Sequence, residues 1–181
     1  TKERFALALR ELLESNSFES ISVGDIVGLS GLSSRTFYNH FRDKNELLAY
    51  LYRITVEPLW YTDGKRNSLE TFFTCCKDNF LHNGTLKGFG NALSYYGQND
   101  LRSEIENKGV EDLVRLLKWN RFPGAITPEL REVLHFFMCG ITRYFEKYYL
   151  DSKTIQVDWL YAFWINCVPA YLAEYLVKEP E

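Results

Sequence analysis

The sequence has few cysteines, and none stands at a spacing typical of a metal-binding or redox motif. Cys75, Cys76, Cys139 and Cys167 form no Cys-x-x-Cys pair and no zinc-ligand pattern, and adjacent cysteines are poorly placed to bridge each other. We therefore expect reduced thiols in a cytoplasmic protein that holds no metal and no cofactor. Oxidant or metal sensing by the adjacent pair is a second interpretation, but only Lys77 lies beside it to lower a thiol pKa.

Long hydrophobic runs are also scarce. The most apolar stretch, residues 159–176, contains Asn166, Pro169 and Glu174 and is shorter than the roughly 20 apolar residues that a membrane-spanning helix needs. No signal peptide is recognisable at the start of the sequence. We therefore expect a buried helix over residues 159–176 and no association with a membrane.

Motifs that carry enzyme chemistry are absent as well. The histidines His40, His82 and His135 are scattered, and we find no glycine-rich phosphate loop, nucleophile elbow or metal-ligand cluster. The net charge of −3 argues against a generally basic, nucleic-acid-binding surface. Residues 1–53, however, contain seven basic and seven acidic residues, so the acidic excess lies in the rest of the chain. The sequence predicts no enzyme and leaves the N-terminal segment as the place to look for function.

Helical periodicity dominates what is present, and no segment alternates convincingly as a β-strand would. With 181 residues, 46% of them apolar, the chain can bury a substantial core in one or two domains. We predict four short helices before Pro58 and five longer ones after it, with a kink or a lost hydrogen bond at Pro169. The expected ranges are 2–15, 23–29, 33–39, 44–56, 66–81, 86–96, 101–119, 128–149 and 157–177.

Capping residues support the short helices of the N-terminal segment. Ser22 and Asp25 stand at capping-box-like spacing, although Asp replaces the usual Glu or Gln. Ser33 is placed to cap the third helix, and Asp43 with Glu46 to cap the fourth. These positions predict where three of the four helices begin.

The second and third short helices flank the turn Ser-Gly-Leu at residues 30–32. Gly31 supplies the positive φ that a tight turn between helices requires. Ile26, Phe37 and Phe41 fall where two steeply crossing helices would bury them. This is the spacing of a helix-turn-helix motif, whose second helix presents its N-terminal residues to the major groove of DNA. A small helical subdomain with a solvated polar face is the alternative.

The side chains of residues 33–39 suit DNA recognition. Arg35 can bind guanine or phosphate, Asn39 can read adenine, and Thr36 can contact a thymine methyl group or a phosphate. Tyr38 can reach a phosphate oxygen with its hydroxyl group. Lys44 adds a cation beside the free N–H groups at the start of the fourth helix, which favours an anion there.

Residues 18–48, FESISVGDIVGLSGLSSRTFYNHFRDKNELL, closely resemble the DNA-binding domain of the tetracycline-repressor (TetR) family of bacterial transcription regulators. The residues that match the family pattern are Ser33, Thr36, Phe37, Tyr38, His40, Phe41, Lys44 and Leu47. Arg35 departs from it, because glycine is common at that position, and offers a donor for a different operator preference. The DNA-binding residues expected from spacing and resemblance together are Ser22, Ser33, Ser34, Arg35, Thr36, Tyr38, Asn39, His40 and Lys44.

The resemblance implies an all-α protein with two domains. A three-helix helix-turn-helix domain is expected over residues 1–53, and a helical-bundle domain for ligand binding and dimerisation over residues 54–181. It implies a regulator, expected to be a repressor, that binds a palindromic operator in double-stranded DNA as a homodimer and responds to a small-molecule effector. The apolar helices expected at 128–149 and 157–177 are candidates for a four-helix dimer interface, and a core role is their alternative. A coactivator that works through a partner protein is the alternative for the whole chain.

Residues that would line an effector pocket are harder to read from the sequence. The candidates are Trp60, Phe72, Phe73, Tyr95, Tyr96, Trp119 and His135. Aromatic residues at helical spacing are more often core than pocket, and a histidine on an apolar face is more often a satisfied core residue. We expect helix 44–56 to couple an occupied pocket to the DNA-reading head.

Overall fold

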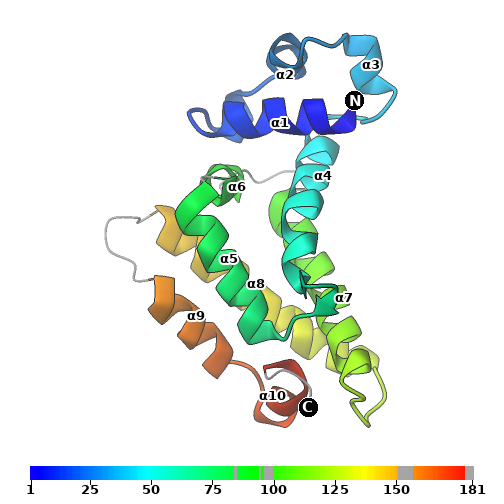
Figure 1. Ribbon diagram of the computed structural model, residues 1–181, viewed down its shortest axis with the longest axis vertical. Helices are drawn as coiled ribbons and strands as arrows, with labels where there is room; N and C mark the ends of the chain where they lie inside the picture. Colours follow the sequence, from blue (N-terminus) through cyan, green and yellow to red (C-terminus); the bar gives the residue numbers. More distant parts are fainter. Residues whose placement is uncertain (84, 94, 96–99, 151–156, 178–181) are drawn as a thin grey trace. The chain divides into compact units, whose positions relative to one another are not determined.

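A computed structural model gives the fold and describes residues 1–83, 85–93, 95, 100–150 and 157–177. The described chain is mostly helical, which confirms the predicted fold class (Figure 1). It divides into two compact units. The first comprises Thr1–Glu57 with Asn79–Leu101, and the second comprises Pro58–Asp78 with Arg102–Glu181.

The first unit is built around α1, which packs against α2, α4 and α6. Its elements are α1 (Lys2–Leu13), the 3₁₀ turn η1 (Phe18–Ser20), α2 (Val23–Ser30), α3 (Ser34–Tyr38), α4 (Lys44–Val56) and α6 (Thr85–Leu93). The prediction for residues 44–56 is confirmed at both ends, and α3 is one residue shorter at each end than the range 33–39 predicted.

Aromatic side chains fill the core of the first unit. Phe5 of α1 and Phe37 of α3 are fully buried, and their rings meet edge to face with centroids 5.3 Å apart. Phe41 packs on both, at 6.4 Å from Phe5 and 5.7 Å from Phe37. Edge-to-face pairs of this kind add to the free energy of burial. This cluster fixes α3 to α1 and determines which side of α3 faces solvent.

Local signals place α2 and its turn as predicted. The Ser22 side chain accepts a hydrogen bond from the Asp25 N–H group, and the Asp25 side chain accepts one from the Ser22 N–H group, so the capping box is complete. Gly31 ends α2 with φ at 64°, in the left-handed region that glycine adopts without steric cost. The turn predicted between the two helices is confirmed.

The described part of the second unit contains five further α-helices, a 3₁₀ turn and a small hairpin. Its elements are η2 (Glu57–Trp60), β1 (Tyr61–Thr62), β2 (Lys65–Arg66), α5 (Leu69–Asn83) up to Asp78, α7 (Leu101–Trp119), α8 (Pro128–Leu150), α9 (Val157–Asn166) and α10 (Ala170–Leu176). The helix predicted at 101–119 is confirmed at both ends. The helix predicted at 157–177 is divided into α9 and α10 before Pro169, which cannot donate a backbone hydrogen bond.

The hairpin corrects the sequence analysis, which expected no strand. β1 and β2 pair antiparallel, with Thr62 opposite Lys65. The two turn residues between them, Asp63 and Gly64, have φ angles of 51° and 76°. An Asp-Gly pair with positive φ at both residues is the turn preferred by two-residue hairpins. That dipeptide was the available signal, and strands of two residues are too short to show an alternating pattern.

A buried carboxylate organises part of the second unit. Asp112 of α7 is 5% exposed and accepts hydrogen bonds from Lys108 at 2.9 Å and Arg115 at 3.2 Å. Arg66 of β2 donates to the Asp112 carbonyl at 3.1 Å and so ties the hairpin to α7. A buried carboxylate needs such partners, because its desolvation is otherwise costly.

Across the part of the chain that the structure describes, no helix is both long and apolar enough to cross a membrane.

Candidate nucleic-acid interface

The start of α3 is held by a small network of hydroxyl groups. Ser33 is the N-cap, and its Oγ atom accepts a hydrogen bond of 3.1 Å from the Thr36 N–H group. The Ser33 and Thr36 hydroxyl oxygens lie 2.8 Å apart and share a second hydrogen bond. Such a cap satisfies an N–H group that lacks a helical partner and stabilises the first turn. These two hydroxyls therefore shape α3, in addition to any contact with DNA.

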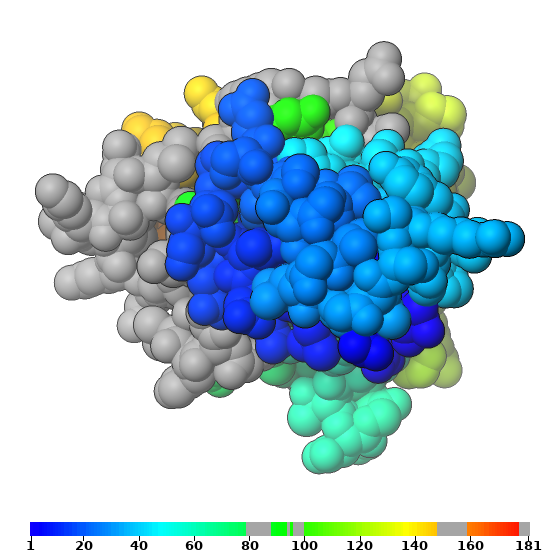
Figure 2. Space-filling model, turned by 90° about the horizontal axis from the view of Figure 1, so that it is seen from above, coloured from blue at the N-terminus to red at the C-terminus, as the bar shows by residue number. Residues whose placement is uncertain are grey.

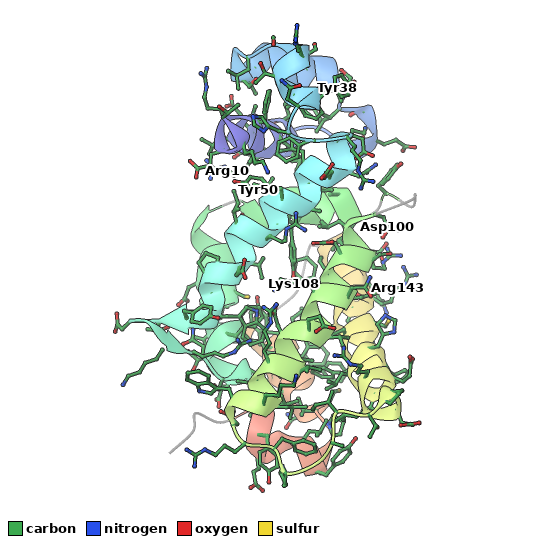
Figure 3. All side chains as sticks on the ribbon, turned by 90° about the vertical axis from the view of Figure 1, so that its right-hand side faces the viewer. Arg10, Tyr38, Tyr50, Asp100, Lys108 and Arg143 are labelled. Atoms are coloured by element: carbon green, nitrogen blue, oxygen red, sulfur yellow. The ribbon has the colours of Figure 1, made fainter. Side chains whose placement is uncertain are left out.

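One side of α3 faces solvent. Ser34, Arg35 and Asn39 are exposed, and Tyr38 is 60% exposed, whereas Phe37 between them is fully buried. The Tyr38 ring packs edge to face on Phe37, with centroids 5.4 Å apart, so its hydroxyl end projects from the surface (Figure 3). Figure 2 shows the face of the first unit on which α2 and α3 lie side by side. Four of the predicted DNA-binding residues therefore share one surface.

At the N-terminus of α2, Ser22 was expected to contact DNA, but its side chain is engaged within the protein. The Ser22 hydroxyl donates to the Asp25 carboxylate at 2.6 Å, and the Ser22 N–H group donates to the same oxygen at 2.8 Å. These hydrogen bonds lower the pKa of Asp25 below its ordinary value. A charged carboxylate thus already occupies this helix start, and a phosphate contact by Ser22 would have to form beside it.

Lys44 is engaged within the protein. Its ammonium group donates to the carbonyl oxygens of Phe18 at 2.8 Å, Glu19 at 3.0 Å and Ile21 at 2.6 Å. An ammonium group has three N–H donors, so these three bonds use its full capacity. Burial lowers the pKa of Lys44 below its ordinary value, and the nearby negative charge of Glu19 offsets part of this effect. The structure therefore joins Lys44 to the η1 turn, whereas the sequence analysis expected it to contact phosphate.

Arg42 is a cation that the sequence analysis did not single out. Its side chain is 81% exposed and pairs with Glu46 at 3.3 Å, while its N–H group donates to the same Glu46 oxygen at 2.7 Å. An exposed ion pair of this kind is weak and breaks easily. Arg42 thus presents an available cation between α3 and α4. Its position just before the N-cap of α4 was the signal that could have found it.

His40 is half-buried, and its ring packs on Phe41 with centroids 6.5 Å apart.

A hydrogen bond joins α1 to the end of α2, where Arg4 donates to the Ser30 carbonyl at 2.7 Å. That carbonyl lies in the last turn of α2, where the helix dipole favours a cation. Arg4 therefore ties α1 to the turn of the helix-turn-helix motif, a link that no local sequence pattern indicated.

The candidate pocket residues do not form one group. Trp60 and Phe72 stack at 3.8 Å in the second unit, and Phe73 packs on Phe72 at 5.7 Å. Tyr95 packs on Phe18 in the first unit. Trp119 is 62% exposed at the end of α7, and Tyr96 lies outside the described residues. Trp60, Phe72 and Phe73 are thus the aromatic candidates that the structure brings together, and all three are buried.

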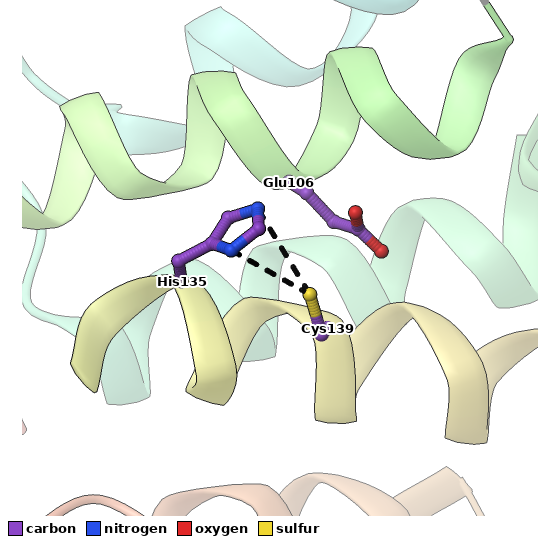
Figure 4. Close-up of side chains that lie close together, drawn as sticks. All are labelled: Glu106, His135 and Cys139. Carbon is purple, nitrogen blue, oxygen red and sulfur yellow. Dashed lines mark hydrogen bonds between the residues drawn. The ribbon is translucent and has the colours of Figure 1, made fainter. Parts of the chain in front are cut away.

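His135, the last candidate, belongs to a different group. It lies on α8 with Cys139, and both ring nitrogens are 4.0 Å from the Cys139 sulfur (Figure 4). Glu106 of α7 completes the group, and one ligand atom from each of the three residues lies within 4.8 Å of the others. Burial and the neighbouring Glu106 raise the pKa of the Cys139 thiol. The sequence alone does not reveal this cluster, because Glu106 comes from another helix.

Comparison with known proteins finds sequence similarity in the segment that contains the helix-turn-helix motif. Residues 7–51 match the family model described as bacterial regulatory proteins, tetR family. The HTH-type dhaKLM operon transcriptional activator DhaS of Lactococcus lactis subsp. lactis is 36% identical over 52 residues, which are 29% of this chain and 28% of that protein. The matched segment therefore spans little more than a quarter of this curated relative.

A solved structure extends the similarity to the fold of nearly the whole chain. The dihydroxyacetone kinase operon activator DhaS covers 96% of this chain and 95% of its own, with a TM-score of 0.62 and 15% sequence identity. At that identity the similarity concerns the fold alone. It covers the helix-turn-helix unit and the helical remainder alike.

Proposed function

We propose that this chain is a TetR-type transcriptional regulator that binds a palindromic operator as a homodimer, because residues 7–51 match the model of that family. The observation that carries the proposal is the exposed face of α3. Its polar residues face solvent because Phe37, packed on Phe5, holds the opposite side of the helix in the core. A recognition helix needs this arrangement, because base edges can be reached only by side chains that project from a fixed helix.

The exposed side chains divide into two roles. Arg35 and Asn39 carry hydrogen-bonding groups that match base edges in the major groove, and they would read sequence. Tyr38 presents a hydroxyl group on a supported ring and would contact phosphate. Ser34, at the first turn of α3, is exposed and would contact either. Thr36, Ser33 and Ser22 contribute mainly by holding the helix starts in place.

Arg42 takes the part in phosphate binding that the sequence assigned to Lys44. The Lys44 ammonium group has its three donors occupied by carbonyl oxygens, whereas Arg42 is held only by an exposed ion pair. A phosphate that displaces Glu46 from Arg42 would keep a charge-assisted contact in place of a weak one. Lys44 would support DNA binding indirectly, because its hydrogen bonds hold the η1 segment that leads into α2.

Dimerisation is proposed through α8 and α9. Phe136, Gly140 and Tyr144 recur every four residues on α8 and are exposed, Phe136 to 82%. A Cβ atom at Gly140 would have no heavy atom within 4 Å, so this strip of the helix is open to a close neighbour. On α9, Trp159 stacks on Phe163, which also contacts Tyr144. A second copy of the chain would cover this apolar face in a two-fold arrangement.

Regulation by an effector and the sign of regulation complete the proposal. We assign effector binding to the second unit, which contains the buried aromatic group of Trp60, Phe72 and Phe73. Repression is the expected outcome of operator binding, and activation is the second candidate, because the relatives with similar sequence and fold are named as operon activators. Such a regulator acts on DNA in the cytoplasm.

The experiment that tests the function is selection of bound duplexes from a random DNA library by the full chain, followed by gel shifts at controlled salt. We expect an inverted repeat whose half-sites are about 10 base pairs apart, or a multiple of that distance, centre to centre. Binding should weaken steeply as salt rises. The proposal would be contradicted if the wild-type chain enriches no DNA sequence and the Arg35→Ala variant retains as much DNA as the wild type.

A further inference from the structure

Glu106, His135 and Cys139 bring three different metal-binding side chains to one place in the second unit. His135 and Cys139 are four residues apart on α8, so they lie on the same face of the helix. Glu106 reaches them from α7 (Figure 4). All three side chains are partly buried, and their ligand atoms lie within 4.8 Å of one another. Neither the DNA-binding surface nor the proposed dimer face uses this group.

We propose that Glu106, His135 and Cys139 bind one divalent metal ion of the Zn²⁺ class. A thiolate, an imidazole nitrogen and a carboxylate oxygen form a donor set that zinc prefers, whereas magnesium and calcium require oxygen ligands. Three protein ligands leave the fourth tetrahedral position to water or to a small ligand. The proposal does not depend on DNA binding and goes beyond the proposed function.

The distances are close to those of a bound metal. A tetrahedral zinc ion places sulfur and nitrogen ligands about 3.5 Å apart, given its usual bond lengths. The Cys139 sulfur lies 4.0 Å from both ring nitrogens of His135, so a small rotation of the imidazole would direct one nitrogen at the metal. Binding would replace the thiol proton of Cys139 by the metal and release that proton to solvent.

The surroundings support the ligands. Thr142, one turn after Cys139 on α8, donates a hydrogen bond of 2.7 Å to the Glu106 carboxylate and so orients it. Such outer contacts commonly hold the ligands of metal sites. Arg102, whose charge acts on Cys139, is paired with Glu146 at 2.9 Å. The hydrogen bond from Thr142 therefore holds the Glu106 carboxylate beside the other two ligands.

The test is a titration of the purified, metal-stripped full chain with Co²⁺. This ion binds at zinc sites and can be followed by its visible and near-ultraviolet absorption. We expect the cobalt absorption to saturate at one equivalent and to include a thiolate-to-cobalt charge-transfer band. Addition of Zn²⁺ should displace Co²⁺ and remove this absorption. Zn²⁺ should also raise the melting temperature, and Mg²⁺ should not. Absence of saturable one-to-one binding would overturn the proposal, whatever the behaviour of the variants.

Variants identify the ligands. Cys139→Ser should abolish the charge-transfer band, and His135→Gln and Glu106→Gln should weaken Co²⁺ binding more than the roughly 10–100-fold typical of an outer contact. Thr142→Val should fall within that outer range. Cys167→Ser, at an exposed cysteine, is the matched control and should bind as the wild type does. A charge-transfer band that survives Cys139→Ser, or one that disappears in Cys167→Ser, would place the metal elsewhere and overturn the assignment.

Discussion

The ammonium group of Lys44 lies 4.7 Å from the centre of the Phe18 ring and donates a 2.8 Å hydrogen bond to the Phe18 carbonyl oxygen. One side chain thus makes both a cation–π and a hydrogen-bond contact with a residue 26 positions earlier. Phe18 is fully buried and begins the η1 turn that precedes α2. The start of α4 and the entry to the helix-turn-helix motif are therefore held together by one cation.

Replacement of Lys44 by methionine should lower the free energy of unfolding by about 2–3 kcal/mol, because three carbonyl oxygens lose a charged donor. Denaturant unfolding followed by circular dichroism measures the effect. Lys65→Met, at an exposed lysine of the hairpin, is the control and should change stability little. Equal stability of the two variants would refute the structural role of Lys44.

Arg35 and Tyr38 should give different kinds of loss in operator binding. Arg35→Ala should relax the preference at one base-pair position by about 1–3 kcal/mol, because a base-reading donor is lost. Tyr38→Phe should weaken binding to all sequences by about 1 kcal/mol, because it removes one hydroxyl contact to phosphate and no charge. Binding to a panel of single-base operator variants separates the two. The role assignment fails if Tyr38→Phe alters the order of preference or Arg35→Ala leaves it intact.

Arg42→Ala should weaken DNA binding and reduce its salt dependence. Removal of one phosphate contact lowers the slope of log K against log salt by about 0.9. For the Lys44→Met variant, the slope of log K against log salt should stay unchanged when K is calculated for the folded molecules alone. The reason is that the Lys44 ammonium group is bound to carbonyl oxygens. Gel shifts or anisotropy over a series of salt concentrations give both slopes. If the slope falls for Lys44→Met and not for Arg42→Ala, the phosphate contact belongs to Lys44.

The capping box should make stability depend on acid pH. Hydrogen bonds from Ser22 lower the pKa of Asp25 below its ordinary value of 3.8 in the folded protein, so the stabilisation is complete above that value and is lost as pH falls through the lower, folded-state pKa. Asp25→Asn should therefore be less stable than wild type at neutral pH, and the difference should vanish in acid. Thermal melts from pH 7 to pH 2 measure it. In a Ser22→Ala background the Asp25→Asn effect should shrink, and a full effect there would show that the two residues are not coupled.

A charge on the aromatic face of α8 should disrupt dimerisation. Phe136→Glu places a carboxylate at a position that is 82% exposed in the single chain and would be buried against a second copy. Sedimentation equilibrium should show a monomer, and operator affinity should fall while the helical content stays unchanged. Trp119→Glu, at another exposed aromatic residue, is the matched control and should remain a dimer. Dimers of both variants would exclude this face as the interface.

Much of the first unit could be predicted from local sequence. Ser22 with Asp25, the glycine at residue 31 and Asp43 are signals read within a few residues, and each marks the helix boundary that the structure has. The exposed position of Arg35 follows from the burial of Phe37 two residues later, which helical periodicity also implies. The short hairpin at Asp63 and Gly64 was overlooked, although its turn dipeptide is equally local.

By itself, the sequence determined the helical class, the helix-turn-helix motif and the side chains of α3 that face solvent, because caps, turns and helical faces are set by residues within one or two turns of each other. Only the tertiary structure decided that the Lys44 ammonium group donates to carbonyl oxygens of the segment around η1, and that Glu106 meets His135 and Cys139. Lys44 lies 23 to 26 residues from its carbonyl partners, and Glu106 comes from a different helix than His135 and Cys139, so the packing of whole helices determines which side chains reach each other.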